Sequence, residues 1–242
     1  MRPTLLKHLL IVLLALSTVT ACKKDDFPVK DADSYGNISY FAKASGSGVE
    51  RRENKSDGTM NTVAVEWSSA SIYVEKIAFV GKSDNLLDTV IFVEKNIDIF
   101  NADALAGIIK LPTGSYKDVK VKLFCLKSKN SDLAFDLKGT FRNTKGGIDH
   151  VRVGSSFPFE ADLTVTDITI NPSDEYKATF TFNLDKVMTG ISTELLQTAR
   201  SFNQPDNSLL YVIWKGGSDE EPFYDQVVEN WQTVASVVVT KQ

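Results

Sequence analysis

Apolar and polar residues alternate with a period of two along most of the chain after residue 60. This period places successive side chains on opposite faces of a β-strand, so that one face of each strand can be buried. The alternating runs are rich in Val, Ile, Thr and aromatic residues, and turn residues separate them. Many short strands spaced in this way indicate a sandwich or a barrel. We predict strands over residues 61–67, 71–80, 89–94, 119–126, 133–141, 151–153, 161–170, 176–184, 209–214 and 234–240.

Three segments interrupt the alternation. Residues 184–201 form the best helix candidate, because their apolar residues recur mostly at spacings of three and four. Gly190 followed by Thr193-Glu194 is consistent with a second helix start inside this segment. Residues 103–107 and 226–231 are each predicted as a short helical turn. We expect the longest segment to cap the core without contributing chemistry.

The first 21 residues follow a different pattern. Arg2 and Lys7 form a short cationic region, and an apolar run of eight residues extends from Leu9 to Leu16. That run is too short to span a bilayer as a helix, which needs about 20 residues. A charged start, a short apolar stretch and small residues at the end predict a cleavable signal peptide over residues 1–21.

The predicted cleavage site precedes a cysteine. Val19-Thr20-Ala21-Cys22 resembles the lipobox of bacterial lipoproteins, in which a branched apolar residue and two small residues precede an obligatory Cys. The resemblance implies a thioether-linked diacylglycerol and an N-acyl group on Cys22, and three acyl chains anchor a protein firmly to a membrane. The alternative is an ordinary signal peptide that contains a Cys by chance.

A polar segment with few apolar residues follows, and we predict a flexible tether over residues 22–36. Within it, Lys24, Asp25 and Asp26 are similar to the surface-export signal of Bacteroidota lipoproteins. The similarity implies a location on the outer face of the outer membrane, whereas a plain solvated tether is the alternative. Residues 37–242 are then predicted to form a single β-sandwich domain.

The segment 97–126 carries the most family-like pattern. Pro112 cannot donate to a β-ladder and Gly114 permits a tight bend, so a turn is predicted there, with Tyr116 filling the core behind it. Over roughly residues 60–190, the arrangement resembles β-sandwich domains of unknown function in Bacteroidota lipoproteins. Some of these domains are grouped with carbohydrate-binding-like and prealbumin-like folds. We therefore predict an all-β fold, an Ig-like or prealbumin-like β-sandwich with one short helix.

Composition narrows the possible functions. Cleavage before Cys22 leaves 25 basic and 31 acidic side chains, a net charge of −6, and no basic cluster, which argues against a nucleic-acid partner. Lipidation of Cys22 leaves Cys125 without a disulfide partner, so we interpret Cys125 as a small buried apolar residue. His150 is the one histidine after the signal peptide. A Ser-His-Asp triad or a His-based zinc site would have to depend on this single residue, so neither is predicted. The sequence predicts no catalytic residue, no metal site and no cofactor.

Aromatic residues offer the best candidate binding site. Trp214 ends a predicted strand and precedes a polar loop, and Tyr211 lies on the same strand. An aromatic residue next to a polar loop is the composition that a glycan-binding site uses. A core position for Trp214 is the alternative. We predict a membrane-anchored, surface-exposed lipoprotein that acts as a non-catalytic binding module, with glycan as the candidate ligand. A structural or assembly lipoprotein that docks on another envelope protein is the second hypothesis, and a hydrolase with paired carboxylates is the third.

Overall fold

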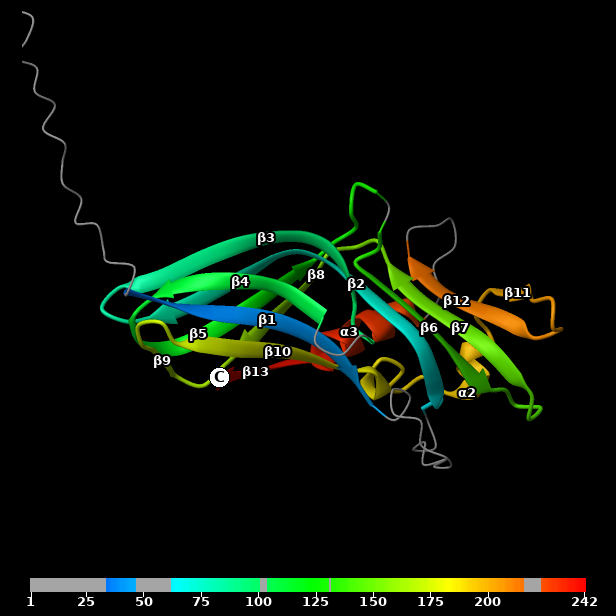
Figure 1. The fold of residues 1–242 in the computed structure, drawn as a ribbon. Coiled ribbons are helices and arrows are strands. Elements are labelled where there is room, and N and C mark those ends of the chain that lie inside the picture. Colours follow the sequence, from blue (N-terminus) through cyan, green and yellow to red (C-terminus); the bar gives the residue numbers. More distant parts are fainter. Residues whose placement is uncertain (1–33, 47–61, 101–103, 131, 216–222) are drawn as a thin grey trace, which may run out of the picture. The chain divides into compact units, whose positions relative to one another are not determined.

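The computed structural model describes residues 34–46, 62–100, 104–130, 132–215 and 223–242 (Figure 1). The predicted signal peptide, the lipidation site Cys22 and the export residues Lys24, Asp25 and Asp26 lie outside these described residues. Within them, no helix is long and apolar enough to cross a membrane.

Nearly all regular structure in the described residues is β-strand. The strands are β1 (Tyr35–Ser45), β2 (Val65–Lys82), β3 (Leu86–Asp98), β4 (Ala104–Pro112), β5 (Gly114–Cys125), β6 (Phe135–Arg142), β7 (Ile148–Ser155), β8 (Phe159–Thr164), β9 (Ile168–Ile170), β10 (Glu175–Asn183), β11 (Ser201–Asn203), β12 (Leu209–Lys215) and β13 (Ala235–Lys241). The helices are the 3₁₀ turn η2 (Leu184–Lys186), α2 (Thr193–Leu196) and α3 (Tyr224–Val234).

The strands form two sheets. One has four strands in the order β13-β10-β1-β4, in which β1 and β10 are parallel and the other pairs are antiparallel. The other has nine strands, with the path β11-β12-β7-β6-β2-β5-β8, to which β3 adds on β2 and β9 on β5. Most of its pairs are antiparallel, but β12 and β7 are parallel.

The long strand β2 connects the two halves of the larger sheet. It pairs with β6 from Val65 to Ile72, and with β3 and β5 further along. Register shifts between Trp67 and Ser69 and between Val74 and Lys76 mark irregularities of the β-bulge kind, which bend a strand and increase its twist. One strand can therefore serve two differently oriented parts of the sheet.

The smaller sheet covers the half of the larger sheet that contains β3, β5 and β8. The edges of the two sheets meet on both sides, because β4 contacts β3 and β13 contacts β8. Buried side chains from both sheets form one continuous hydrophobic core, which includes the stacked rings of Tyr40 and Phe180 at 5.8 Å. The prediction of an all-β, sandwich-like fold is confirmed.

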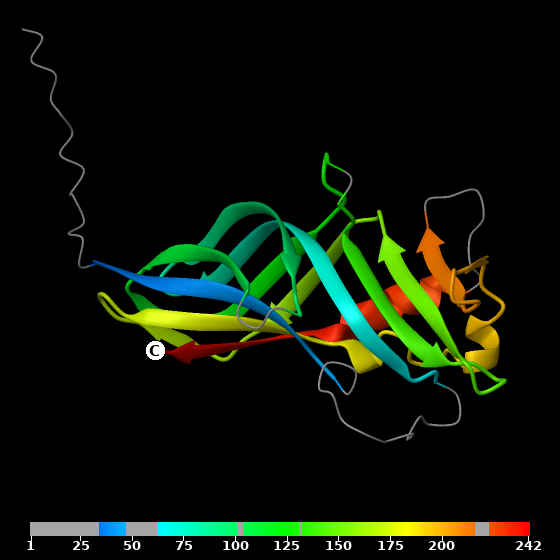
Figure 2. The same ribbon diagram turned by 45° about the vertical axis from the view of Figure 1, so that its right-hand side comes forward.

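Helix α3 covers the other half of the larger sheet (Figure 2). It buries Tyr224, Val227, Asn230, Trp231 and Val234, which recur at spacings of three and four and so share one helix face. The Asn230 amide on this face donates hydrogen bonds to the carbonyls of Val187 (3.1 Å) and Thr189 (2.8 Å). The helix predicted at 226–231 is thus confirmed, and it is the longest helix in the described part of the chain.

The predicted turn before residue 119 is also confirmed. β4 ends at Pro112, and β5 begins at Gly114, whose φ of 150° is one that other residues rarely adopt. Tyr116 is 2% exposed, and its hydroxyl donates to the Pro112 carbonyl at 2.7 Å. Local residue chemistry was therefore sufficient to predict the turn and the core position of Tyr116.

Several local predictions need correction. The segments predicted as separate strands at 61–67 and 71–80 belong to one strand, β2, and the strand predicted at 161–170 divides into β8 and β9. Residues 104–107 belong to β4 rather than to a helical turn, because pairing with β1 outweighs the weak helical preference of an Ala-rich segment. The predicted helix at 184–201 divides into η2 and α2, with a left-handed Gly190 (φ 78°) between them and Ser192 capping α2. Strand β1 begins at Tyr35, inside the segment predicted as tether.

Candidate binding site on the outer face of the larger sheet

Three strands at one end of the larger sheet bring polar and aromatic side chains to one face. β7 pairs with β6 on one side and with β12 on the other, so Gly154 lies between Asp136 and Trp214 in one row. In the next row, Arg152 lies between Lys138 and Val212. Because side chains alternate along each strand, these residues point away from the buried face. We call this group the Trp214 face; it comprises Asp136, Lys138, His150, Arg152, Val212 and Trp214.

Trp214 is half-buried on this face, and its indole lies over Gly154. A Cβ atom at residue 154 would lie 3.2 Å from Cζ3 of the indole, so the absence of a side chain there lets the ring approach the sheet. The guanidinium of Arg152 lies 5.5 Å from the ring centroid, within cation–π range. The backbone beneath the ring and the cation beside it both restrain the indole.

Arg152 is itself held in place by Asp136. Its Nε donates to Oδ1 at 2.8 Å and its Nη2 donates to Oδ2 at 2.9 Å, a bidentate pair. Lys138 contributes a second, longer contact to the same carboxylate at 3.9 Å. A bidentate pair fixes the plane of the guanidinium, and therefore the groups beside Trp214 are arranged before any ligand arrives.

A histidine and an acidic side chain lie close together at the far end of the face. His150 Nε2 lies 3.8 Å from Oδ2 of Asp206, in the loop between β11 and β12. Hydrogen bonds from the Ser208 hydroxyl and backbone N–H lower the pKa of Asp206, and His150 lowers it further by a smaller amount. The face thus presents acids and bases close together, a surface that suits a polar, uncharged ligand rather than an ion.

Tyr211 does not join Trp214 on this face. It is 4% exposed and packs edge-on against Phe141, with ring centroids 5.6 Å apart. Residues 211 and 214 differ by an odd number of positions, so a regular strand directs them to opposite faces. A ligand that stacks on Trp214 cannot reach the Tyr211 ring, and Tyr211 is better described as a core residue.

The other two tryptophans are buried. Trp67 is 3% exposed, and its Nε1 donates to the Leu184 carbonyl at 3.2 Å. Trp231 is 1% exposed and stacks between Phe135 (4.6 Å) and Phe182 (5.9 Å). Trp214 is therefore the one tryptophan of the three with a ring partly open to solvent.

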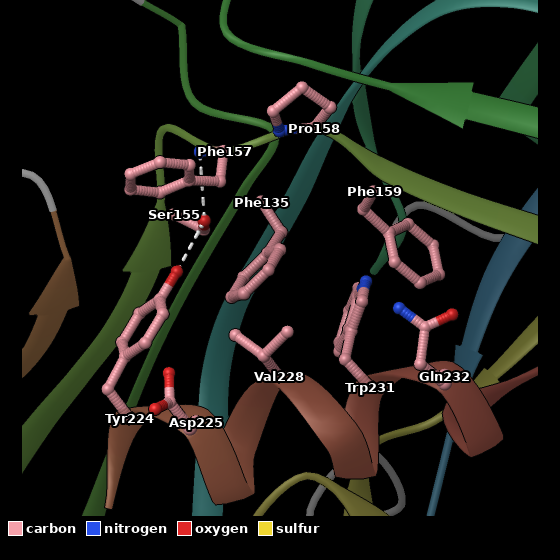
Figure 3. A pocket seen from close by; sticks show the side chains of 10 residues that line it. All are labelled: Phe135, Ser155, Phe157, Pro158, Phe159, Tyr224, Asp225, Val228, Trp231 and Gln232. Carbon is pink, nitrogen blue, oxygen red and sulfur yellow. Dashed lines mark hydrogen bonds between the residues drawn. The ribbon is translucent and has the colours of Figure 1, made fainter. Parts of the chain in front are cut away.

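A cavity of about 150 Å³ lies beside α3, and nothing in the residue pattern had indicated it (Figure 3). Trp231 and Val228 of α3 line one side, and Phe157 and Phe159 line another. The apolar periodicity of residues 224–234 predicts the helix but not the strands that it covers. No local motif could have marked this site.

Other candidate chemistry is sparse in the described part of the chain. Among these residues no three His, Cys, Asp or Glu side chains are grouped so that they could hold a metal ion. Cys125 is 1% exposed, and burial raises the pKa of its thiol far above the usual value, so the inert neutral form persists at physiological pH.

Comparison with known proteins adds little. No family model matches the chain. No curated protein matches it either. Among solved structures, it is similar to a proposed cell adhesion protein from Bacteroides eggerthii, at 13% sequence identity and a TM-score of 0.26. The match covers 86% of this chain and 55% of that one, so the chain spans about half the length of that protein. A likeness this distant carries no inference about function.

Proposed function

We propose that the protein is a lipoprotein, anchored through Cys22 on the cell-surface side of the outer membrane, that binds glycans without catalysis through the Trp214 face. The observation that carries the proposal is the half-buried indole of Trp214, which lies on Gly154 beside the fixed Arg152–Asp136 pair. A flat aromatic ring stacks on the apolar face of a sugar, and neighbouring fixed polar groups can bond to its hydroxyls.

Glycan binding is tested with the full-length protein purified in detergent. A glycan array identifies bound sugars, and calorimetry then compares Trp214→Ala with Phe92→Ala. Phe92 is the control because its ring is 72% exposed on β3, away from the Trp214 face. We expect Trp214→Ala to weaken binding at least tenfold, since burial of an aromatic side chain contributes about 1.5–3 kcal/mol, and Phe92→Ala to leave binding unchanged. An array without any bound glycan would reject this function.

Anchoring and location are tested separately in cells. Cys22→Ser should move the protein from the membrane fraction to the soluble fraction, because the acyl chains supply the anchor. Proteinase added to intact cells should digest the native protein while a periplasmic control protein stays intact. Protection of the protein would place the domain in the periplasm. Lys24, Asp25 and Asp26 would then be part of the tether without acting as an export signal.

A second function, docking on another envelope protein, is favoured by one observation. The outward side chains of β3 include Leu86, Val90 and Phe92, which are 69%, 44% and 72% exposed. Exposed apolar side chains on one strand are typical of interaction surfaces. Crosslinking in intact cells should then give a defined protein adduct that Phe92→Asp removes and Trp214→Ala leaves, the reverse of the glycan experiment.

A further inference from the structure

The cavity beside α3 lies under the short connection between β7 and β8 (Figure 3). Phe157 and Pro158 of that connection lie above it in the view, and α3 lies below. It is on the opposite side of the sheet from the Trp214 face, because Phe135, which lines it, precedes the outward-facing Asp136 on β6. The two sites are therefore independent.

The walls of the cavity are mainly aromatic and apolar. Phe135, Phe159 and Val228 contribute carbon surface, and the exposed ring of Phe157 stands at the connection. A volume of about 150 Å³ matches that of an engineered apolar protein cavity known to bind benzene. The described lining residues include no Lys, Arg or His, so a buried anion would find no counter-charge. The space therefore suits one neutral ring.

Trp231 supplies an unusual polar atom to this apolar site. The residue is 1% exposed, and its Nε1 has no hydrogen-bond partner in the described structure. In Figure 3 this nitrogen lies at the end of the indole nearest Pro158 and Phe159, which both line the cavity. A buried N–H without an acceptor is costly, and native proteins rarely leave one unpaired.

Two other polar side chains of the wall, Ser155 and Tyr224, are buried and bond to each other, whereas Asp225 and Gln232 are exposed. Ser155 is 2% exposed, and its Oγ accepts hydrogen bonds from the Tyr224 hydroxyl (2.5 Å) and from the Phe157 N–H (3.0 Å). These bonds tie α3 to the end of β7 and hold the connection over the cavity. Among the buried side chains of the lining, Trp231 Nε1 is thus the donor that has no partner in the described structure.

We propose that this cavity binds a small neutral molecule that carries a single aromatic ring and a hydrogen-bond acceptor. The ring packs against Phe135, Phe159 and Val228, and the acceptor receives the hydrogen bond from Trp231 Nε1. Such a ligand removes the unsatisfied donor and fills the apolar space at once. Neither of these gains depends on the Trp214 face or on a glycan.

The test uses two probes of similar ring size with the full-length protein. Acetophenone carries a carbonyl acceptor, whereas toluene does not, and isothermal titration calorimetry measures both. We expect acetophenone to bind about tenfold more tightly than toluene, the value of one hydrogen bond. Trp231→Phe should remove that preference while leaving toluene binding within about threefold. No binding of either probe, or an unchanged preference in Trp231→Phe, would overturn the proposal.

A filling substitution tests the location without touching the donor. Val228→Trp places a large side chain in the cavity and should abolish binding of both probes. Val238→Trp is the matched control, since Val238 is 59% exposed on β13 and lies outside the cavity lining. Thermal melting establishes that each variant is folded. Retained binding in Val228→Trp would also overturn the proposal, even if Trp231→Phe fails to fold.

Discussion

Trp214 and Trp231 pack on opposite faces of the same three-strand region, and the same residue type has different neighbours in each place. Trp214 lies half-exposed over Gly154, with Arg152 beside its ring. Trp231 is enclosed by Phe135, Phe159 and Phe182, and its N–H has no partner among the residues that the structure describes. The first offers a ring face to solvent, and the second offers one donor inside an apolar space. Environment rather than residue type therefore decides which ligand chemistry each could serve.

The largest expected effect is on stability. Trp231→Ala should lower the free energy of unfolding by about 3–5 kcal/mol, because it empties the centre of an aromatic cluster. Trp214→Ala should lower it by about 1 kcal/mol or less, because the ring is half-exposed. Urea denaturation of both variants measures the difference. Equal losses would mean that the Trp214 ring is part of the core.

The next effect compares the stability cost of losing a buried indole N–H that has a hydrogen-bond acceptor with the cost of losing one that has none among the described residues. Trp67 and Trp231 are both buried, but Trp67 Nε1 bonds to the Leu184 carbonyl and Trp231 Nε1 bonds to no described residue. Trp67→Phe should therefore cost about 1–3 kcal/mol more than Trp231→Phe, since it leaves a carbonyl unpaired. The same denaturation experiment checks this. A larger loss in Trp231→Phe would show that its N–H is satisfied in the folded protein.

A smaller effect concerns the support beneath Trp214. In Gly154→Ala the new Cβ would lie 3.2 Å from the indole and 3.1 Å from Leu133 Cδ1, so the ring must shift. We expect a stability loss of about 1 kcal/mol, as for mild overpacking, and weaker glycan binding. A double-mutant cycle with Trp214→Ala is the control. Part of the Gly154→Ala loss should disappear when the indole is absent, and strict additivity would contradict the stacking.

The smallest effect concerns pH and the strand that follows α3. Hydrogen bonds from Lys241 (2.7 Å), Asn171 and Tyr176 lower the pKa of Asp174 to about 2. A lowered folded-state pKa means that this carboxylate stabilises the fold above about pH 4, and that the contribution is lost as pH falls towards 2. The urea midpoints of the wild type and Asp174→Asn should differ more at pH 6 than at pH 2.5.

Several features of the fold could be predicted from local residue patterns. The strand around residues 176–183 follows from its two-residue period, because burial of one face is enough to specify it. The turn at Pro112 and Gly114 follows from their backbone restrictions. The same alternation rule also separates Tyr211 from Trp214, which our site prediction had grouped together. The odd spacing between residues 211 and 214 was enough to place their side chains on opposite faces of the strand.

Other features depended on partners distant in the chain. Residues 104–107 form a strand because β1 pairs with them, and nothing in their own composition requires it. The cavity beside α3 forms where Phe135, Ser155 and Trp231 meet, and the Ser155–Tyr224 hydrogen bond joins residues 69 positions apart. No window of sequence contains such a site, so periodicity cannot indicate it.

The sequence by itself determined the all-β character, most strand positions, helix α3 and the choice of Trp214 as a candidate residue, because each depends on local periodicity or on a single residue's chemistry. Only the tertiary structure decided that Gly154 and the Arg152–Asp136 pair support Trp214, and that the Trp231 N–H beside the cavity has no partner in the described part of the chain. These facts depend on strand order and on the packing of α3. Sheet register and helix docking are set by the total burial of many residues, which no short segment encodes.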